Sequence, residues 1–262
     1  MTTTRTEAVE LLAADPPRTA LFVDFDGTLA PIVADPSLSV ALPDTVATLR
    51  LLAGHLHTVG VVSGRPAAFL LERLGGAGGL RLFGLYGSEA VDDDGRVAET
   101  TALSNDPAAI AALVARARAA LPADAVEDKG RSLALHWRRH PLLEPTMRGL
   151  ADELASAAGM RVHEAKMSLE LLPAGAPSKG TVVRAVAAGL SCVAFAGDDL
   201  GDLAAFDALD ELAAAGAGTL RIAVAGPEMP AALAARADLQ VEGPAELAAL
   251  FGELARRLAP AR

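Results

Sequence analysis

The sequence predicts an α/β protein in which a parallel-sheet core is interrupted by a smaller inserted α+β domain. The chain has 262 residues, a length that fits either one large domain or a core that carries an insertion. Short apolar runs alternate with helical patterns near both ends of the chain, which is typical of a parallel sheet. Between these two regions, the segments that resemble strands alternate between polar and apolar residues. We therefore assign residues 1–104 and 176–262 to the core and residues 105–175 to the inserted domain.

The first part of the core begins with a short apolar run over residues 20–25, which ends in acidic residues and Gly27. This run predicts a buried strand that leads into a loop. A helical pattern and a second apolar run follow it, so the three elements form a βαβ unit. The elements expected after the first strand are a helix at 43–52, a strand at 59–62, a strand at 82–86 and a hairpin turn at 92–95.

The texture of the sequence changes from about Asn105, where alanine-rich helical patterns alternate with strands of mixed polarity. Strands of this kind predict one exposed face, as in a small α+β domain. We expect helices at 107–121 and 143–158, strands at 132–137 and 167–172, and a boundary at 173–177. The parallel pattern then resumes with a helix at 180–188, a strand at 192–196, a loop at 197–202 and a last strand at 221–224.

Composition and charge narrow the class of protein. Hydrophobic residues make up 52% of the chain and aromatic residues 3%, so the core must consist mostly of Ala, Leu and Val. The formal charge of −10 argues against nucleic acid and anionic membranes as partners. The single cysteine, Cys192, cannot form an internal disulfide, and the sequence has neither a signal-peptide pattern nor an apolar stretch of membrane-spanning length. We expect a soluble, cytoplasmic protein and favour a monomer.

Two carboxylates, Asp24 and Asp26, follow the first predicted strand. Ligands bind open parallel sheets at this end of the strands. Two solvated aspartates before a turn are the alternative interpretation. The longer pattern Asp24-Phe25-Asp26-Gly27-Thr28 resembles the first motif of the phosphatases of the haloacid dehalogenase superfamily, which implies a Rossmannoid core. The resemblance makes Asp24 the nucleophile and a Mg²⁺ ligand, and Asp26 the acid/base, with only the main-chain carbonyl of Asp26 on the metal.

Three further segments follow predicted strands or begin a predicted helix. Ser63-Gly64-Arg65 offers a hydroxyl and backbone N–H groups for phosphate oxygens, although a helix N-cap alone would explain the serine. Lys179 begins a helix and could supply a compact cation. The segment 197–202 gathers three carboxylates in one loop, which suits a hard cation with oxygen ligands.

The order of these four segments is similar to that of the four superfamily motifs. The resemblance implies that Asp198 binds Mg²⁺ and that Asp199 and Asp202 support the metal site, although a structural role for Asp199 stays open. It implies that Ser63 and Lys179 hold the phosphate as catalytic residues. We include three neighbouring residues among the substrate-binding candidates, namely Thr28, Gly64 and Arg65.

A finer resemblance, to trehalose-6-phosphate phosphatases, extends from about Thr19 to Leu254. It rests on LFVDFDGTLAPIV at 21–33 and on two segments of the inserted domain, at 127–138 and 166–170. It implies that the insertion is a cap that binds the sugar of a small sugar-phosphate substrate. The implied sugar-binding residues are Glu127, Lys129, Lys166, Ser168 and Glu170. A solvated strand face with salt-bridging charges is the alternative for these residues.

The chain departs from the pattern of that family at several positions. Tyr86 and Ser88 stand where His and Ala are common, Leu172 where Arg is common, and Gly201 where Thr is frequent. The predicted reaction is hydrolysis of trehalose 6-phosphate through an aspartyl-phosphate intermediate. A phosphatase of another sugar or pseudo-disaccharide phosphate, a phosphomutase and an inactive sugar-phosphate-binding regulator are the alternatives.

Overall fold

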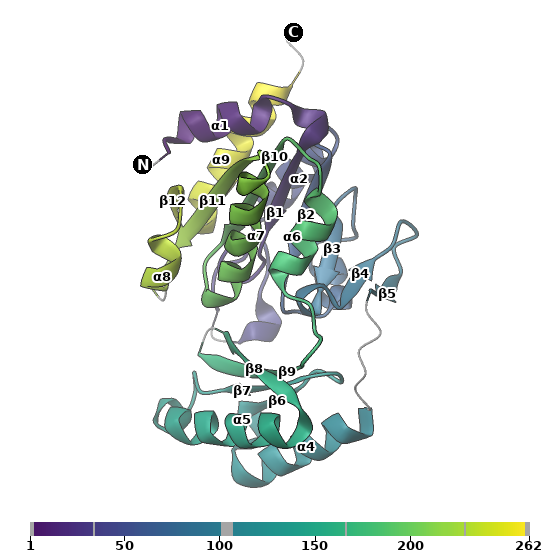
Figure 1. Ribbon diagram of the computed structural model, residues 1–262, viewed down its shortest axis with the longest axis vertical. Helices are drawn as coiled ribbons and strands as arrows, with labels where there is room; N and C mark the ends of the chain where they lie inside the picture. Colours follow the sequence, from purple (N-terminus) through teal and green to yellow (C-terminus); the bar gives the residue numbers. More distant parts are fainter. Residues whose placement is uncertain (1–2, 34, 101–106, 166, 228, 260–262) are drawn as a thin grey trace. The chain divides into compact units, whose positions relative to one another are not determined.

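The computed structural model describes residues 3–33, 35–100, 107–165, 167–227 and 229–259 (Figure 1). The chain forms two compact units. Unit 1 comprises Met1–Thr100 and Pro177–Arg262, and unit 2 comprises Thr101–Ala176.

Unit 1 contains a sheet of eight strands in the order β12-β11-β10-β1-β2-β3-β4-β5. The strands from β12 to β3 pair in parallel, whereas β4 and β5 form an antiparallel hairpin on β3. The bounds are β1 (Thr19–Val23), β2 (Thr58–Val62), β3 (Arg81–Gly84), β4 (Glu89–Val91), β5 (Val97–Glu99), β10 (Cys192–Gly197), β11 (Gly218–Ala225) and β12 (Leu239–Glu242). The parallel sheet and the hairpin turn at 92–95 are as predicted.

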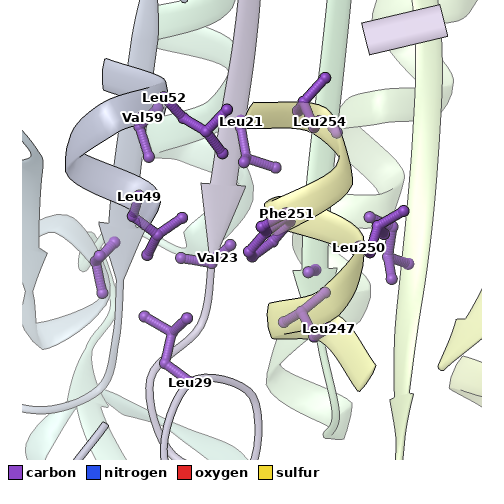
Figure 2. Close-up of a cluster of buried hydrophobic side chains, with 14 of the residues drawn as sticks. Leu21, Val23, Leu29, Leu49, Leu52, Val59, Leu247, Leu250, Phe251 and Leu254 are labelled. Carbon is purple, nitrogen blue, oxygen red and sulfur yellow. The ribbon is translucent and has the colours of Figure 1, made fainter. Parts of the chain in front are cut away.

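Helices cover both faces of this sheet because its central strands are apolar on both faces. Leu21 and Val23 of β1 pack with α1, α2 and α9, and Figure 2 shows them beside Leu49 and Phe251. Phe22 of β1 packs instead with α6 and α7, which lie in front of the strands in Figure 1. The helices of unit 1 are α1 (Arg5–Ala13), α2 (Pro43–Ala53), α3 (Ala67–Arg73), α6 (Lys179–Ala187), α7 (Leu203–Ala214), α8 (Ala231–Ala234) and α9 (Gly243–Leu258).

Three details of unit 1 differ from the prediction. The first strand begins at Thr19 and ends at Val23, so the apolar run at 20–25 extends past its end. The third strand ends at Gly84, because Leu85 and Tyr86 take left-handed backbone angles in a 3₁₀ turn. The strand at 221–224 is not the last one, since β12 follows it along the edge of the sheet. That edge strand is short and alternates in burial, so it carries little apolar signal.

Unit 2 is an antiparallel sheet in the order β6-β7-β9-β8 with two helices packed on it. Trp137 belongs to the hydrophobic cluster between sheet and helices, as expected for a core residue. The elements are α4 (Pro107–Ala120), β6 (Val126–Asp128), β7 (Leu133–His136), α5 (Glu144–Ala158), β8 (Met160–Ala165) and β9 (Ser168–Pro173).

The prediction for unit 2 omitted β6 and β8, and one expectation was wrong. We expected strands with one exposed face, but all six residues of β9 are buried. The polar side chain of Glu170 on this strand is buried because Lys129 and Ser132 bind its carboxylate. Among the described residues, no helix combines the length and the apolar character that a membrane span requires.

Candidate active site

Three adjacent strands bring the predicted motifs together at the carboxyl end of the sheet of unit 1. In the strand order, β1 lies between β10 and β2, and Val23 is in register with Ala196 on one side and Val61 on the other. The backbone N–H of Asp24 donates to the carbonyl of Ala196 at 2.9 Å. The residues that follow these strands, Asp24, Ser63 and Asp198, are therefore neighbours although they are far apart in the sequence.

A buried lysine joins two of the carboxylates. Lys179 Nζ lies 2.8 Å from Asp24 Oδ1 and 2.6 Å from Asp202 Oδ1. All three residues are buried, with Lys179 only 2% exposed. The lysine is the first residue of α6, which starts there because Ser178 caps its N-terminus. Pairing with two carboxylates is what allows this ammonium group to be buried.

Asp202 is held in place by the loop that contains it. Its Oδ2 accepts the backbone N–H groups of Asp198 at 2.8 Å and Asp199 at 3.0 Å. Gly197 leaves the necessary space, since a Cβ there would lie 2.2 Å from Asp202 Cγ. Asp199 Oδ1 accepts the N–H of Gly201 at 2.8 Å, which gives Asp199 a structural role within the loop.

Asp24, Asp198 and Asp202 form an acidic group suited to a cation. One carboxylate oxygen from each lies within 4.8 Å of the other two. Thr28 Oγ1 donates to Asp198 Oδ1 at 3.2 Å, and Gly27, at φ +84°, leaves room for Asp198 where a Cβ would approach its Oδ2 to 2.1 Å. Lys179 pairs with Asp24 and Asp202, two of these three buried carboxylates. Oxygen ligands of this kind fit a hard divalent cation.

Burial and charge shift the pKa values in this group. Burial raises the pKa of Asp24 well above its usual range and that of Asp202 to about 7, although Lys179 opposes both shifts. Burial by itself would lower the pKa of Lys179, but the carboxylates of Asp202 and Asp24 raise it well above its usual value. The lysine therefore stays an ammonium, and a further cation would favour the ionised carboxylates.

The side chain of Asp26 is bound by Arg65 and not by Lys179. Arg65 donates from Nε to Asp26 Oδ2 at 2.7 Å and from Nη2 to Oδ1 at 3.2 Å. The Arg65 guanidinium also stacks over the ring of Phe69, 4.8 Å from its centre. Ser63 Oγ accepts the backbone N–H of Arg65 at 3.2 Å. The predicted residues of the first and second motifs are thus in direct contact.

A strained turn at Leu85 and Tyr86 supports the segment that contains Ser63. Of these two residues, only Tyr86 was singled out from the sequence, as a departure from a family pattern. Leu85 and Tyr86 have φ values of 47° and 59°, which are costly for residues other than glycine. Their N–H groups donate to the carbonyls of Arg65 and Ser63, each at 2.9 Å. A Cβ on Gly64 would lie 2.7 Å from the Tyr86 hydroxyl, so the ring packs closely against this loop.

Three candidates of unit 2, Glu127, Ser168 and Glu170, lie on strands of its sheet. Lys129 directly follows β6, and Lys166 falls outside the described residues. Lys129 Nζ lies 2.7 Å from Glu170 Oε2, and Ser132 Oγ donates to Glu170 Oε1 at 2.7 Å. Glu127 Oε2 lies 2.8 Å from His136 Nε2, and His136 is in register with Ser168 on β9. Ser132 was missing from the sequence-based candidates because a serine at the start of a strand has no distinctive signal.

Known structures share this fold. The C-terminal domain of Candida albicans trehalose-6-phosphate phosphatase is 21% identical with a TM-score of 0.81, and 97% of each chain is covered. A haloacid dehalogenase-like hydrolase from Bacteroides thetaiotaomicron has a TM-score of 0.62 at 16% identity and covers 90% of this chain and 98% of that one. This likeness shows that the fold of the chain is haloacid dehalogenase-like.

The chain belongs to the trehalose-phosphatase family, whose model matches residues 22–238. A probable trehalose-phosphate phosphatase of Sinorhizobium fredii is 32% identical over 84% of this chain and 82% of that protein. The Escherichia coli trehalose-6-phosphate phosphatase is 31% identical over 81% and 80%. A Mycobacterium tuberculosis protein described as an uncharacterized glycosyl hydrolase is 34% identical over 73% of this chain, which spans only 15% of its length.

Proposed function

We propose that this protein hydrolyses trehalose 6-phosphate to trehalose and phosphate. The observation that carries the proposal is the Asp24 carboxylate, buried at the end of β1 and paired with Lys179 beside Asp198. Membership of the trehalose-phosphatase family supports the choice of substrate. The fold alone would not support this choice of substrate. The C-terminal domain of a Candida albicans trehalose synthase regulatory protein has the same fold, at 12% identity and a TM-score of 0.73.

In the proposed reaction, a carboxylate oxygen of Asp24 attacks phosphorus and forms an aspartyl phosphate as the bond to the sugar oxygen breaks. Asp26 donates a proton to the departing sugar oxygen. Asp26 then takes a proton from the water that attacks the aspartyl phosphate, which releases phosphate and regenerates Asp24. The 4% exposure of Asp24 keeps this carboxylate away from bulk water.

We infer that the metal is Mg²⁺, a hard cation that takes oxygen ligands. Asp24, Asp198 and the main-chain carbonyl of Asp26 would hold it, with Asp202 and Asp199 supporting the loop behind it. When bound, Mg²⁺ offsets the combined negative charge of the phosphate and the nucleophile.

The remaining candidates would bind the substrate. Lys179 and Ser63 would hold the phosphate oxygens, with Thr28, Gly64 and Arg65 in the adjoining loops. We assign the catalytic core to residues 1–104 and 176–262 and a cap to residues 105–175. In the cap, Glu127, Lys129, Lys166, Ser168 and Glu170 would bind sugar hydroxyls by accepting and donating hydrogen bonds. A cytoplasmic location fits the single buried thiol of Cys192, which has no need of an oxidising compartment. We also propose that the protein is a monomer.

The test is phosphate release from trehalose 6-phosphate, sucrose 6-phosphate and glucose 6-phosphate, with Mg²⁺ and with a chelator, compared by kcat/KM. We expect preference for trehalose 6-phosphate and dependence on the metal. Asp24→Asn should lower kcat by at least about 1,000-fold with an unchanged far-UV spectrum, because it removes the nucleophile. Asp93→Asn, in the exposed hairpin turn, is the control and should retain activity. Preference for another sugar phosphate, or substantial activity in Asp24→Asn, would contradict the proposal.

A further inference from the structure

Arg65 holds both carboxylate oxygens of Asp26 through two of its nitrogens. The two distances, 2.7 Å from Nε to Oδ2 and 3.2 Å from Nη2 to Oδ1, describe a two-point ion pair. The two side chains are 18% and 29% exposed, so the pair is partly shielded from water. A guanidinium that binds a carboxylate at two points fixes its direction as well as its distance.

The side chain and the backbone of Arg65 both have further contacts. It stacks over Phe69, whose ring meets the edge of Phe25, the residue between Asp24 and Asp26, at a centroid distance of 5.8 Å. The backbone of Arg65 is hydrogen-bonded on both sides, from its N–H to Ser63 Oγ and from Leu85 N–H to its carbonyl. This arginine is therefore placed in advance of any ligand.

The helix beside Arg65 is fixed as well. Glu89 Oε2 accepts the N–H of Ala67 at 2.8 Å, at the first residue of α3. A Cβ on Gly84 would lie 2.1 Å from the same nitrogen, so β3 packs tightly against the start of the helix. The segment that carries Arg65 cannot move far without disrupting both contacts.

Asp26 lies in a more open position. It follows the end of β1 and precedes Gly27, and its own side chain is attached to the loop through Arg65. An aspartate side chain has three staggered χ1 orientations. The two-point pair with Arg65 selects one of them. Without it, the carboxyl could also take the other two orientations.

We propose that Arg65 is a positioning residue that keeps the carboxyl of Asp26 in one orientation, rather than a ligand of the phosphate. This inference rests on the proposed function, in which Asp26 transfers the proton. It replaces the substrate-binding role given above to Arg65, and leaves the roles of Ser63 and Lys179 unchanged. Two donor nitrogens of Arg65 face Asp26, and the ring of Phe69 lies against the same guanidinium.

Substrates with different leaving groups can distinguish a residue that positions Asp26 from a residue that binds the phosphate. A sugar oxygen needs a proton as it leaves phosphorus, so its release depends on a correctly oriented Asp26. p-Nitrophenolate is stable without that proton, and its release depends on phosphate binding and on Asp24. The measurement is a single-turnover experiment with enzyme in excess and Mg²⁺ present, in which release of sugar or of p-nitrophenolate reports only the first chemical step.

The variants are Arg65→Gln, Arg65→Lys, Asp26→Asn and the double variant Arg65→Gln/Asp26→Asn. General acids contribute about 10²–10⁴-fold, so we expect Arg65→Gln to slow sugar release by about 10–100-fold and p-nitrophenolate release by less than about threefold. Arg65→Lys should show the same selective loss, because it keeps the charge but not the two-point geometry. Asp26→Asn should also be selective, and the double variant should be no slower than Asp26→Asn.

Arg73→Lys is the matched control. The Arg73 guanidinium stacks on the same Phe69 ring at 5.2 Å, but its Nη2 donates to the carbonyl of Ser37. Both substrates should react at the wild-type rate in this variant. Far-UV spectra check that each variant is folded.

Equal losses for the two substrates in Arg65→Gln, with recovery in Arg65→Lys, would overturn the proposal and make Arg65 a phosphate ligand. A double variant slower than Asp26→Asn would overturn it too, because Arg65 would then act independently of Asp26. Failure of the proposed function is a separate result: the wild type would not hydrolyse trehalose 6-phosphate. The comparison is then made with the sugar phosphate that the wild type hydrolyses.

Discussion

Lys179→Met tests the buried ion pair that organises the candidate active site. The substitution keeps most of the length of the side chain and removes the ammonium that lies 2.8 Å from Asp24 Oδ1 and 2.6 Å from Asp202 Oδ1. The two carboxylates would stay buried and lose their shared cation. Removal of one partner from a buried ion pair costs about 3–5 kcal/mol, so we expect the free energy of unfolding to fall by about that amount.

The loss should depend on pH. Without the ammonium, the pKa of Asp202 rises further above the value of about 7 that it has beside Lys179. The folded variant then holds a proton that the unfolded chain releases above the ordinary pKa of 3.8. Protons are bound more strongly in the folded state, so the stability of the variant falls as the pH rises. The deficit relative to the wild type should therefore be larger at pH 8 than at pH 6.

The assay is urea unfolding followed by far-UV circular dichroism, at both pH values and with a chelator present so that bound metal does not contribute. Arg184→Met is the matched control, because Arg184 lies on the same helix and pairs with Glu211, but both side chains are largely exposed, at 40% and 60%. It should cost at most about 1 kcal/mol. Adding Asp202→Asn to Lys179→Met should restore part of the loss, since the Asn amide is neutral at both pH values. The reasoning fails if Lys179→Met costs no more than the control.

A substitution at Gly27 and chemical labelling of Cys192 test two other parts of unit 1. Gly27→Ala should abolish metal-dependent activity and cost more stability than Gly95→Ala, because its Cβ would lie 2.1 Å from Asp198 Oδ2, whereas Gly95 has a similar positive φ with no atom within 4 Å. Equal losses of stability in urea unfolding, or activity retained in Gly27→Ala, would show that the close approach to Asp198 is unimportant. Burial raises the pKa of Cys192 from 9.0 to about 11, which lowers its thiolate fraction at pH 8 by about 100-fold. Iodoacetamide should therefore label the folded protein very slowly and the urea-unfolded protein quickly, and rapid labelling of the folded protein would contradict the buried position.

Much of the core could be predicted because its strands are short apolar runs. The runs at 20–23 and 59–62 are buried on both faces, so every residue carries the same signal. The strands β8 and β12 were missed for the opposite reason. Several of the residues of β8 are only partly buried, and β12 alternates between buried and exposed, so neither has a continuous apolar run.

The residues of the candidate site could also be predicted from the sequence. Asp24, Ser63 and Asp198 each follow an apolar run, and Lys179 begins a helix, which places them at the carboxyl end of a parallel sheet before any distance is known. The partners of these side chains were not readable. Nothing local relates Arg65 to Asp26, which is 39 residues away, or Lys129 to Glu170, which is 41 residues away.

The sequence by itself determined the chemistry available to this protein: the strands, the acidic loops that end them and the membership in a family of phosphatases. Only the tertiary structure decided which charged side chains form ion pairs with one another. The order β10-β1-β2 brings three loops together and buries Lys179 between two carboxylates, and the strained turn at Leu85 and Tyr86 supports the loop that directs Arg65 to Asp26. The physical reason is that hydrophobic patterns act over a few residues, whereas an ion pair depends on how distant segments pack.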